Sequence, residues 1–292
     1  PDMAIIAGDI FDERVALDSP AARCAVSFVM RLGSICPVLI LQGTESHDRD
    51  MPYIFGSLRA VHDIHVVSGM EQVVLQENRF IKENNFIFIH CSQAIFSCLP
   101  PISKANIADK IIPSQELLRD VLKGWSSIAQ SFGNTPHIFV GHISVMGAEY
   151  NSGIQAIDDT AIPIDVLKTL NADYYALGHL HKHQRWDNVC YSGSITRMDF
   201  GEEKDEKGFM LAEIGDKQNN NGDRNYFFKP VPARKMLTID LGNIDSGICD
   251  IKRVESDAIV RLRFSVSEEN IHRQDIDVFI NSTLAEKIKI VF

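Results

Sequence analysis

Short apolar runs alternate with amphipathic stretches along the first 180 residues or so of the chain. The runs are Met3–Ala7, Pro37–Gln42, Phe86–His90, His137–Val140 and Tyr174–Leu177. Between the first two runs, apolar residues recur at helical spacing over residues 21–32. A second helical stripe covers residues 117–128, with Ser114 as a candidate N-cap. This alternation predicts an α/β architecture with buried strands.

The pattern changes after residue 185, where short apolar segments follow one another without amphipathic stretches between them. These segments are Val189–Ser192, Gly208–Ile214, Tyr226–Val231, Lys235–Leu241 and Ile259–Val266. The polar stretch over residues 215–225 predicts an exposed hairpin loop, and Pro230-Val231-Pro232 indicates a domain boundary. We therefore predict one domain over residues 1–232 and the start of a smaller α/β domain over residues 233–292. Both ends of the sequence are apolar, so we expect the native polypeptide to continue past them.

Composition narrows the class of protein. The chain has 292 residues, of which 45% are hydrophobic and 23% charged, values that indicate a globular protein and exclude a disordered or collagen-like one. No apolar stretch approaches the roughly 18 residues of a transmembrane helix. The six cysteines form no CxxC pair, which favours a reduced, cytoplasmic protein. A net charge of −10 excludes a uniformly basic nucleic-acid coat, but permits a local basic patch or an acidic pocket filled by cations.

Four of the predicted strands end in a glycine followed by side chains that can bind metal. The segments are Gly8-Asp9, Gly43-Thr44-Glu45-Ser46-His47-Asp48, Gly141-His142 and Gly178-His179-Leu180-His181. Glycine allows a sharp turn and a close approach of the backbone, and ligands bind at the carboxyl ends of parallel strands. We expect these segments to share one pocket, with His142 and His179 no more than about 12 Å apart, because paired metals lie about 4 Å from each other.

The residue types indicate the metal and its chemistry. A carboxylate with several neutral imidazoles suits Mn, Fe or Zn better than Ca or Mg. His179 and His181 are two positions apart, so in an extended segment both point to one side. A carboxylate such as Asp9 can bridge two cations about 3.5–4 Å apart, which together activate a water molecule for in-line attack on phosphorus.

The ordered set GDxxD, SHD, GH and GHxH resembles the calcineurin-like metallophosphoesterases. Within them, the stretch Tyr191–Glu203 followed by Lys207-Gly208-Phe209 resembles the SbcD branch of DNA double-strand-break repair nucleases. The resemblance covers residues 1–232 well, and residues 233–292 in outline as the beginning of a DNA-capping domain. It implies a four-layer α-β-β-α sandwich followed by part of a small α/β capping domain.

The resemblance also implies roles for individual residues. The implied metal ligands are Asp9, as the bridging carboxylate, and Ser46, His142, His179 and His181. His47 resembles the catalytic histidine that contacts the phosphate and protonates the leaving oxygen. Asp12 stands where it would support His47 or the substrate phosphate, and Asp48 is expected to orient the loop.

The sequence departs from the family pattern at two places. The family begins with D-x-H on a strand upstream of GDxxD, and that strand would precede Pro1. Asp63-Ile64-His65 has the D-x-H form, but it follows both other motifs, and we interpret it as a coincidence on a surface strand. The family motif G-N-H-D is lengthened by two residues here, with Ser46 in place of the ligand asparagine and Glu45 as an alternative ligand.

The resemblance implies a DNA phosphodiesterase: the 3′-to-5′ exonuclease and endonuclease component of an SbcCD-type repair complex. It implies two divalent metal ions, Mn first, with Fe, Zn or Mg as alternatives. The implied partners are DNA, an SbcC-type ATPase and a second copy of the chain, with no membrane. Candidate contacts to DNA phosphates are few: Lys182, Arg185, Arg197 and Lys204.

Two other functions stay open at this point. The chain could be a calcineurin-like phosphatase or nucleotide phosphodiesterase without a DNA role, or a degenerate, non-catalytic binding module. Three further segments favour structural interpretations: His90-Cys91 as core or pocket lining over a ligand, His183 and Arg185 as part of a solvated loop over substrate contacts, and the charge run Lys204–Lys207 as a solvated turn.

Overall fold

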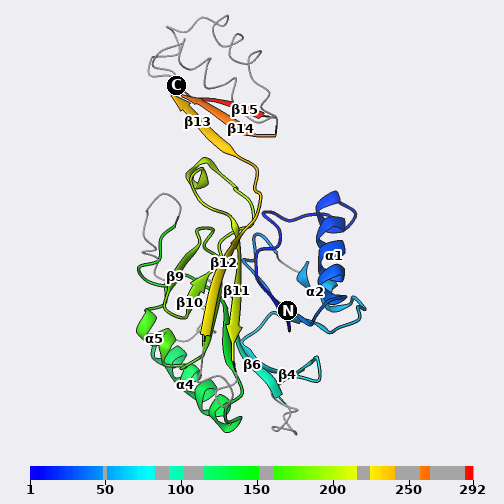
Figure 1. Cartoon of the computed structure of the whole chain (residues 1–292), viewed down its shortest axis with the longest axis vertical. Coiled ribbons are helices and arrows are strands. Elements are labelled where there is room, and N and C mark those ends of the chain that lie inside the picture. Colours follow the sequence, from blue (N-terminus) through cyan, green and yellow to red (C-terminus); the bar gives the residue numbers. More distant parts are fainter. Residues whose placement is uncertain are drawn as a thin grey trace, which may run out of the picture. The chain divides into compact units, whose positions relative to one another are not determined.

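The computed structural model of the chain describes residues 1–48, 51–82, 92–101, 115–150, 161–215, 224–240, 257–263 and 287–291. The chain divides into two compact units. The first unit comprises Pro1–Gly193 and Met210–Phe228, and the second comprises Ser194–Phe209 and Lys229–Phe292. Figure 1 shows the course of the chain and the labels of its elements.

The first unit is built on two sheets. The smaller is parallel, in the order β1-β2-β3, with β1 (Ala4–Ala7), β2 (Val38–Leu41) and β3 (Ile64–Val67). The larger is mixed, in the order β5-β4-β6-β7-β8-β10-β9. Its strands are β4 (Glu71–Gln76), β5 (Arg79–Lys82), β6 (Ser92–Leu99), β7 (His137–His142), β8 (Tyr174–Gly178), β9 (Gln184–Trp186) and β10 (Val189–Tyr191). Because β6, β7 and β8 are mutually parallel, the carboxyl ends of β7 and β8 lie at the same edge.

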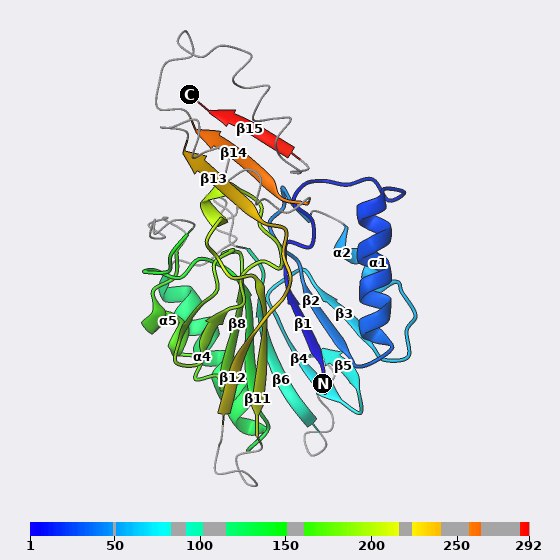
Figure 2. The same ribbon diagram turned by 45° about the horizontal axis from the view of Figure 1, so that its top comes forward.

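Helices cover the outer faces of these sheets. The helices are α1 (Pro20–Gly33), α2 (Pro52–Gly56), α4 (Gln115–Ser131) and α5 (Ile164–Lys168). Val29 of α1 and Phe55 of α2 pack on Ile40 of the small sheet, whose opposite face meets the large sheet. Leu122 of α4 and Leu167 of α5 pack on the far face of the large sheet. Figure 2 shows α1 and α2 on one side of this unit and α4 and α5 on the other.

Helix α1 shows how particular residues determine where a helix begins and which of its faces is buried. Its first turn has Pro20, whose fixed φ and missing N–H suit that position. Ser19 is the N-cap, and its hydroxyl accepts a hydrogen bond from the Ala22 amide at 3.1 Å. The helix buries Ala22 and Val29 of the predicted apolar stripe, together with Gly33, but Phe28 of that stripe is 53% exposed.

Two further strands, β11 (Gly208–Ile214) and β12 (Arg224–Pro230), pair with each other, and most of the polar stretch predicted as the exposed loop between them lies outside the described residues. The second unit contains a parallel sheet, β13-β14-β15, with strands at Met236–Asp240, Ile259–Arg263 and Lys287–Val291. It also contains the short 3₁₀ helix η4 (Phe200–Glu202), in a segment that the sequence pattern placed with the first domain.

Most predicted strands and both predicted helices are present, as α1, α4, β1, β2, β7, β8, β10, β11, β12, β13 and β14. The predicted strand Phe86–His90, the residues His90-Cys91 and the N-cap Ser114 lie outside the described residues. The pattern missed β4 and β6. Their inward-facing side chains include Gln72 and Ser97, which are fully buried and hydrogen-bonded to each other at 2.8 Å, so the apolar pattern is interrupted.

The cysteines of the described residues, Cys24, Cys36, Cys98 and Cys190, all have free thiols, as their spacing predicted. Within the part of the chain that the structure describes, none of the helices combines the length and the apolar character needed to cross a membrane.

Candidate metal centre

Asp9, His142 and His179 come together at the carboxyl ends of β1, β7 and β8. Each offers one ligand atom, and these atoms all lie within 4.8 Å of one another. Asp9 Oδ2 is 3.1 Å from His142 Nε2, and the two imidazole rings meet edge to face with centroids 5.2 Å apart. The expected proximity of His142 and His179 is therefore confirmed. We call Asp9, His142, His179 and the neighbouring Thr44 the metal cluster.

The glycines at the strand ends allow this approach. A Cβ on Gly178 would lie 1.9 Å from the Ala7 carbonyl oxygen, and one on Gly43 would lie 2.1 Å from the Asp9 amide nitrogen. Real Cβ contacts are never this short, so any side chain there would separate the strands that bring the ligands together. The glycine pattern seen in the sequence thus has a steric cause.

Two residues of the metal cluster have a left-handed backbone. Asp9 has φ +51° and His179 has φ +85°, a region that residues other than glycine adopt rarely. Such conformations persist where the surrounding structure holds them, and they concentrate at functional sites. Strain at two of three candidate ligands supports a functional interpretation of the cluster.

Asp48 holds the backbone around Asp9, as the sequence led us to expect. Its side chain is fully buried, and it accepts hydrogen bonds from four backbone amides of the two glycine-containing loops. The donors are Asp9 (2.9 Å), Ile10 (2.8 Å), Phe11 (3.3 Å) and Gly43 (2.9 Å). Burial and the charge of Asp9 raise the pKa of Asp48, against the effect of these amides.

The tautomer of His142 follows from its surroundings. Its side chain is fully buried, and Nδ1 lies 2.7 Å from the Ala7 carbonyl oxygen, which can only accept, so Nδ1 carries a proton. Nε2 is left facing the Asp9 carboxylate. Nε2 and the Asp9 carboxylate, 3.1 Å apart, can share a proton or a cation between them. Metal-binding histidines commonly donate their second N–H to a carbonyl in this way.

The electrostatics of Asp9 fit the same interpretation. Burial alone would raise the pKa of Asp9, but the hydrogen bond and charge of His142, the Thr44 amide and the charge of His47 outweigh it, and the pKa is lowered. Asp9 is therefore held as a carboxylate, the form in which it can bind a cation.

Thr44 is the residue of this site that the sequence analysis missed. Its amide donates to Asp9 Oδ1 at 2.6 Å, and its hydroxyl lies 3.3 Å from Asp9 Oδ2 and 3.2 Å from His142 Nε2. Ser46 and Glu45, the two ligands considered for this loop, are exposed. The available signal was position: Thr44 directly follows the glycine, as Asp9, His142 and His179 do in their own segments. The role of Ser46 stays a prediction.

The two predicted catalytic residues lie beside each other at the surface. His47 Nδ1 is 4.0 Å from Asp12 Oδ1, and the side chains are 32% and 64% exposed. A half-exposed imidazole beside a carboxylate is suited to exchanging a proton with a bound substrate.

The remaining histidines occupy different places. His181 is half-buried and lies outside the group of three, so its role as a ligand stays a prediction. His183 stacks on Phe228 at 4.1 Å and donates through Nδ1 to the Tyr191 carbonyl, so the expectation of a solvated loop is wrong there. His65 pairs with Glu71, and Asp63 accepts from the Phe80 amide, which explains that D-x-H segment structurally.

No protein-family model matches the chain. The SbcD component of the nuclease SbcCD from Staphylococcus saprophyticus is 24% identical to it over 296 residues, which cover 94% of the chain and 72% of the relative. The chain is a distant homologue of the SbcD metallophosphoesterases. The low identity agrees with the unusual loop that contains Thr44 and Ser46.

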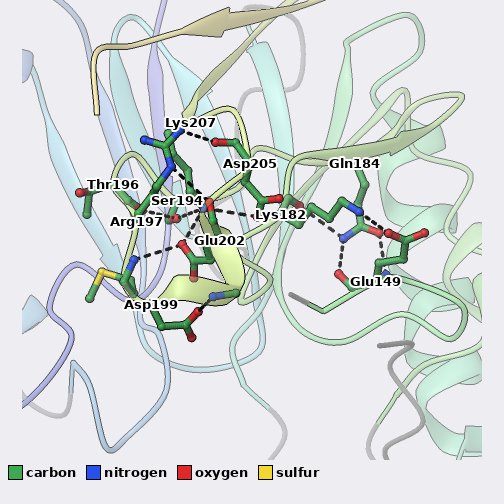
Figure 3. Close-up of polar contacts among 12 residues, drawn as sticks. Glu149, Lys182, Gln184, Ser194, Thr196, Arg197, Asp199, Glu202, Asp205 and Lys207 are labelled. Atoms are coloured by element: carbon green, nitrogen blue, oxygen red, sulfur yellow. Dashed lines mark hydrogen bonds and ion pairs between the residues drawn. The ribbon is translucent and has the colours of Figure 1, made fainter. Parts of the chain in front are cut away.

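In this SbcD homologue, part of the stretch that resembles the SbcD branch builds the second unit. Lys207 Nζ and Glu202 Oε2 form an ion pair at 2.7 Å with both side chains fully buried, and Lys207 also donates to Ser194 Oγ at 2.9 Å (Figure 3). Asp205 lies 3.8 Å from the same ammonium group. Arg197 donates to backbone carbonyls of Glu202, Ala233, Arg234 and Asp205. We call Ser194, Arg197, Glu202, Asp205 and Lys207 the ion-pair cluster.

The ion-pair cluster corrects the expectation of a solvated turn over residues 204–207, and it also bears on the candidate DNA contacts. Lys207 is 2% exposed, so the interpretation of residues 204–207 as a solvated turn is wrong at its last residue. Of the candidate DNA contacts, Lys182 pairs with Glu149, and Arg185 donates to the Tyr226 carbonyl. Arg197 binds carbonyls as described. Three of the four basic candidates thus have partners within the chain, and Lys204 is exposed.

Proposed function

We propose that this SbcD homologue is a metal-dependent phosphodiesterase that acts on DNA. The observation that carries the proposal is the metal cluster: Asp9, His142 and His179 meet at three strand ends in a homologue of a nuclease component. The packing of helix, sheet, sheet and helix in the first unit agrees with the four-layer sandwich of metallophosphoesterases.

The residues present fit a divalent cation. One carboxylate, two imidazoles and the Thr44 hydroxyl form a mixed oxygen and nitrogen donor set, which suits Mn, Fe or Zn. Ser46 and His181 are the further ligands that we propose from the family pattern. Bound divalent metal, two ions in the proposed state, would supply a nucleophilic water near neutral pH and neutralise charge on the phosphate.

The chain's own residues contribute orientation and proton transfer. The His142–Ala7 hydrogen bond fixes one imidazole, and Asp48 fixes the backbone of Asp9. We assign His47 as the general acid that gives its proton to the leaving oxygen, with Asp12 beside it to orient the ring. Exposure of both side chains leaves room for a substrate phosphate.

The finer assignment also comes from the family. We propose 3′-to-5′ exonuclease and endonuclease activity, Mn as the metal, and an SbcC-type ATPase and a second copy of the chain as partners. A nuclease domain over residues 1–232 and a DNA-capping domain that begins at residue 233 remain part of this proposal.

One observation favours the second candidate, a phosphodiesterase without a DNA role. Of the four basic residues considered as DNA contacts, Lys182, Arg185 and Arg197 engage partners within the chain, so these three have less capacity for phosphate contacts along a duplex.

The deciding experiment is a Mn²⁺-dependent digestion of linear duplex DNA beside a small chromogenic phosphodiester, with bound metal measured in the same preparation. Cleavage of both substrates supports the DNA phosphodiesterase. Cleavage of the small substrate alone supports the second candidate. A chain without bound metal and without either activity would be a non-catalytic binding module.

The His47→Ala variant tests the assigned proton donor. It is expected to keep bound Mn²⁺ and to lose about 10²–10⁴-fold in cleavage rate, the usual contribution of a general acid. Loss of metal together with activity would instead make His47 a ligand.

A further inference from the structure

A clasp joins the segment after β7 to the segment after β8. The Gln184 side chain accepts a hydrogen bond from the Glu149 amide and donates one to the Glu149 carbonyl, both at 2.8 Å. Lys182 pairs with the Glu149 carboxylate. Figure 3 shows these contacts. One side-chain amide thus satisfies both backbone polar groups of a residue in the loop that follows His142.

The residue after Glu149 reaches the metal cluster. The Tyr150 ring meets the His179 ring edge to face, with centroids 6.4 Å apart and an interplanar angle of 82°. The Tyr150 hydroxyl lies 3.0 Å from Ser144 Oγ, two residues beyond His142. The clasp therefore positions Tyr150. The Tyr150 ring contacts the candidate ligand His179, and its hydroxyl contacts Ser144, beyond the strand end that carries His142.

His179 needs such support because its backbone is strained. A φ of +85° is unfavourable for a residue with a side chain, and it persists only where the surroundings determine it. The chain is anchored on the carboxyl side of His179 by Gln184, by Lys182 and by His183, which stacks on Phe228. His179 lies between this anchored segment and β8, so its backbone has little freedom to relax.

We propose that Gln184 and Tyr150 are positioning residues for His179. Gln184 fixes Glu149 and the segment after His179 to each other, and Tyr150 packs against the His179 ring so that the imidazole faces Asp9 and His142. The inference rests on the proposed function only in treating His179 as a metal ligand. It assigns the orientation of that ligand to two residues outside the ligand set.

The test uses the full chain and compares Gln184→Met with Gln93→Met. Gln93 is a matched control, because its amide also holds a left-handed residue: it accepts from the Asn78 amide at 3.0 Å, and Asn78 has φ +62°. Gln93 contacts a turn between β4 and β5 and has no part in the clasp. A general effect of removing such an amide would appear in both variants.

The first measurement needs no metal. With histidine selectively labelled, the backbone chemical shifts of His179 report its left-handed conformation in the metal-free protein. We expect these shifts to move toward ordinary values in Gln184→Met and to stay unchanged in Gln93→Met. Unchanged His179 shifts in a folded Gln184→Met would overturn the proposal.

The second measurement is Mn²⁺ affinity by calorimetry. We expect Gln184→Met to bind roughly 10–100-fold more weakly, the usual effect of altering a group that orients a ligand. Tyr150→Phe keeps the ring but loses the contact with Ser144, and it is expected to weaken binding about 10-fold. If Gln184→Met does not fold, as judged by circular dichroism, Tyr150→Phe decides, and wild-type affinity in that variant would count against the proposal.

Failure of the proposed function gives a different result. A wild-type chain that binds Mn²⁺ without cleaving any phosphodiester refutes the enzyme and leaves the clasp supported or refuted by the variants. A wild-type chain that does not bind Mn²⁺ still yields the His179 shifts, which decide the positioning role alone.

Discussion

The metal cluster and the ion-pair cluster both gather ionisable side chains inside the protein, but they differ in what those side chains face. In the ion-pair cluster, the Lys207 ammonium lies against Glu202, Ser194 and Asp205, so opposite charges and hydrogen bonds meet inside the protein. In the metal cluster, the Asp9 carboxylate and two imidazoles direct ligand atoms to one place. The Asp9 carboxylate is partly buried, and the imidazole nitrogens that converge beside it complete a donor set suited to a divalent cation.

This difference between the two clusters explains why one has a structural role and the other a proposed binding role. The ion-pair cluster uses its charges to hold the segment of residues 194–207 to the rest of the second unit, where Glu203 also binds the amide and hydroxyl of Thr238. In the metal cluster, the carboxylate and imidazole ligand atoms converge on one point, and two of the three residues have a strained backbone. Such convergence indicates a binding site, whereas the ion-pair cluster indicates a structural role.

The strongest contrast should come from Lys207→Met. It leaves the Glu202 carboxylate buried without its cation, which costs about 3–5 kcal/mol. We expect the unfolding of the second unit, measured by calorimetry, to shift strongly downward while Mn²⁺ affinity is kept. Lys204→Met, an exposed neighbour, should stay within about 0.5 kcal/mol. The double variant Lys207→Met/Glu202→Leu should recover most of the loss, and no recovery would mean that the pair is not the source of the stability.

Asp9→Asn should have the opposite effect to Lys207→Met, because it should weaken metal binding and leave stability nearly unchanged. It removes the carboxylate of the metal cluster but keeps an acceptor for the Thr44 amide. Mn²⁺ affinity should therefore fall by more than about 100-fold, which is more than the usual effect of changing a residue that only orients a ligand. Stability of the metal-free chain should change by less than about 1 kcal/mol. Asp18→Asn, on the exposed loop before α1, serves as control. A large loss of stability without any loss of metal would make Asp9 a structural residue like Glu202.

Thr44→Val tests the residue that the sequence pattern overlooked. Loss of the hydroxyl near Asp9 and His142 should weaken Mn²⁺ binding about 10-fold, while Thr44→Ser should retain wild-type affinity. Calorimetric titration separates the two. If Ser46→Ala has the larger effect, Ser46 is the neutral ligand and Thr44 only supports Asp9.

A third ionic group, formed by Glu71 with His65 and Lys82, should give the smallest change in stability. Burial would raise the pKa of Glu71, but His65 and Lys82 outweigh it, and the pKa lies below its usual 4.5. The stability that ionised Glu71 contributes is therefore fully present above pH 4.5. It is lost as the pH falls through the lower pKa that Glu71 has in the folded state. Because Lys82 is 57% exposed, Glu71→Gln should cost less than about 1 kcal/mol at pH 7. Urea unfolding should show the difference shrink as the pH falls below 4.5, and a constant difference would contradict the ion pair.

The sequence was most informative where backbone geometry demanded glycine. Gly43 and Gly178 follow strands because a Cβ would collide with a neighbouring strand or loop, so the glycine pattern alone predicted that Asp9, His142 and His179 converge. Thr44 follows a glycine as the three candidate ligands do, but threonine is an ordinary turn residue, so its type gave no reason to assign it to the site.

Buried polar groups were the main obstacle elsewhere. Lys207 resembles a surface lysine in the sequence, and its burial depends on Glu202 and Ser194 reaching the same point in three dimensions. Gln72 and Ser97 interrupt the apolar pattern of β4 and β6, and inside the core the Gln72 side-chain amide donates a hydrogen bond to Ser97 Oγ. Patterns of hydrophobicity carry no information about such pairs.

The hydrogen bond from His142 to Ala7 joins residues 135 positions apart, and it links the small parallel sheet to the large mixed one. Contacts between such distant segments form slowly, after the loop between them has been closed. Asp9 and His179 meet only when β1, β7 and β8 are all in place. Metal therefore has nothing to bind until the first unit is nearly native, and it stabilises the product of folding without guiding the search. During refolding, the appearance of Mn²⁺ affinity would mark the moment at which the two sheets close on each other.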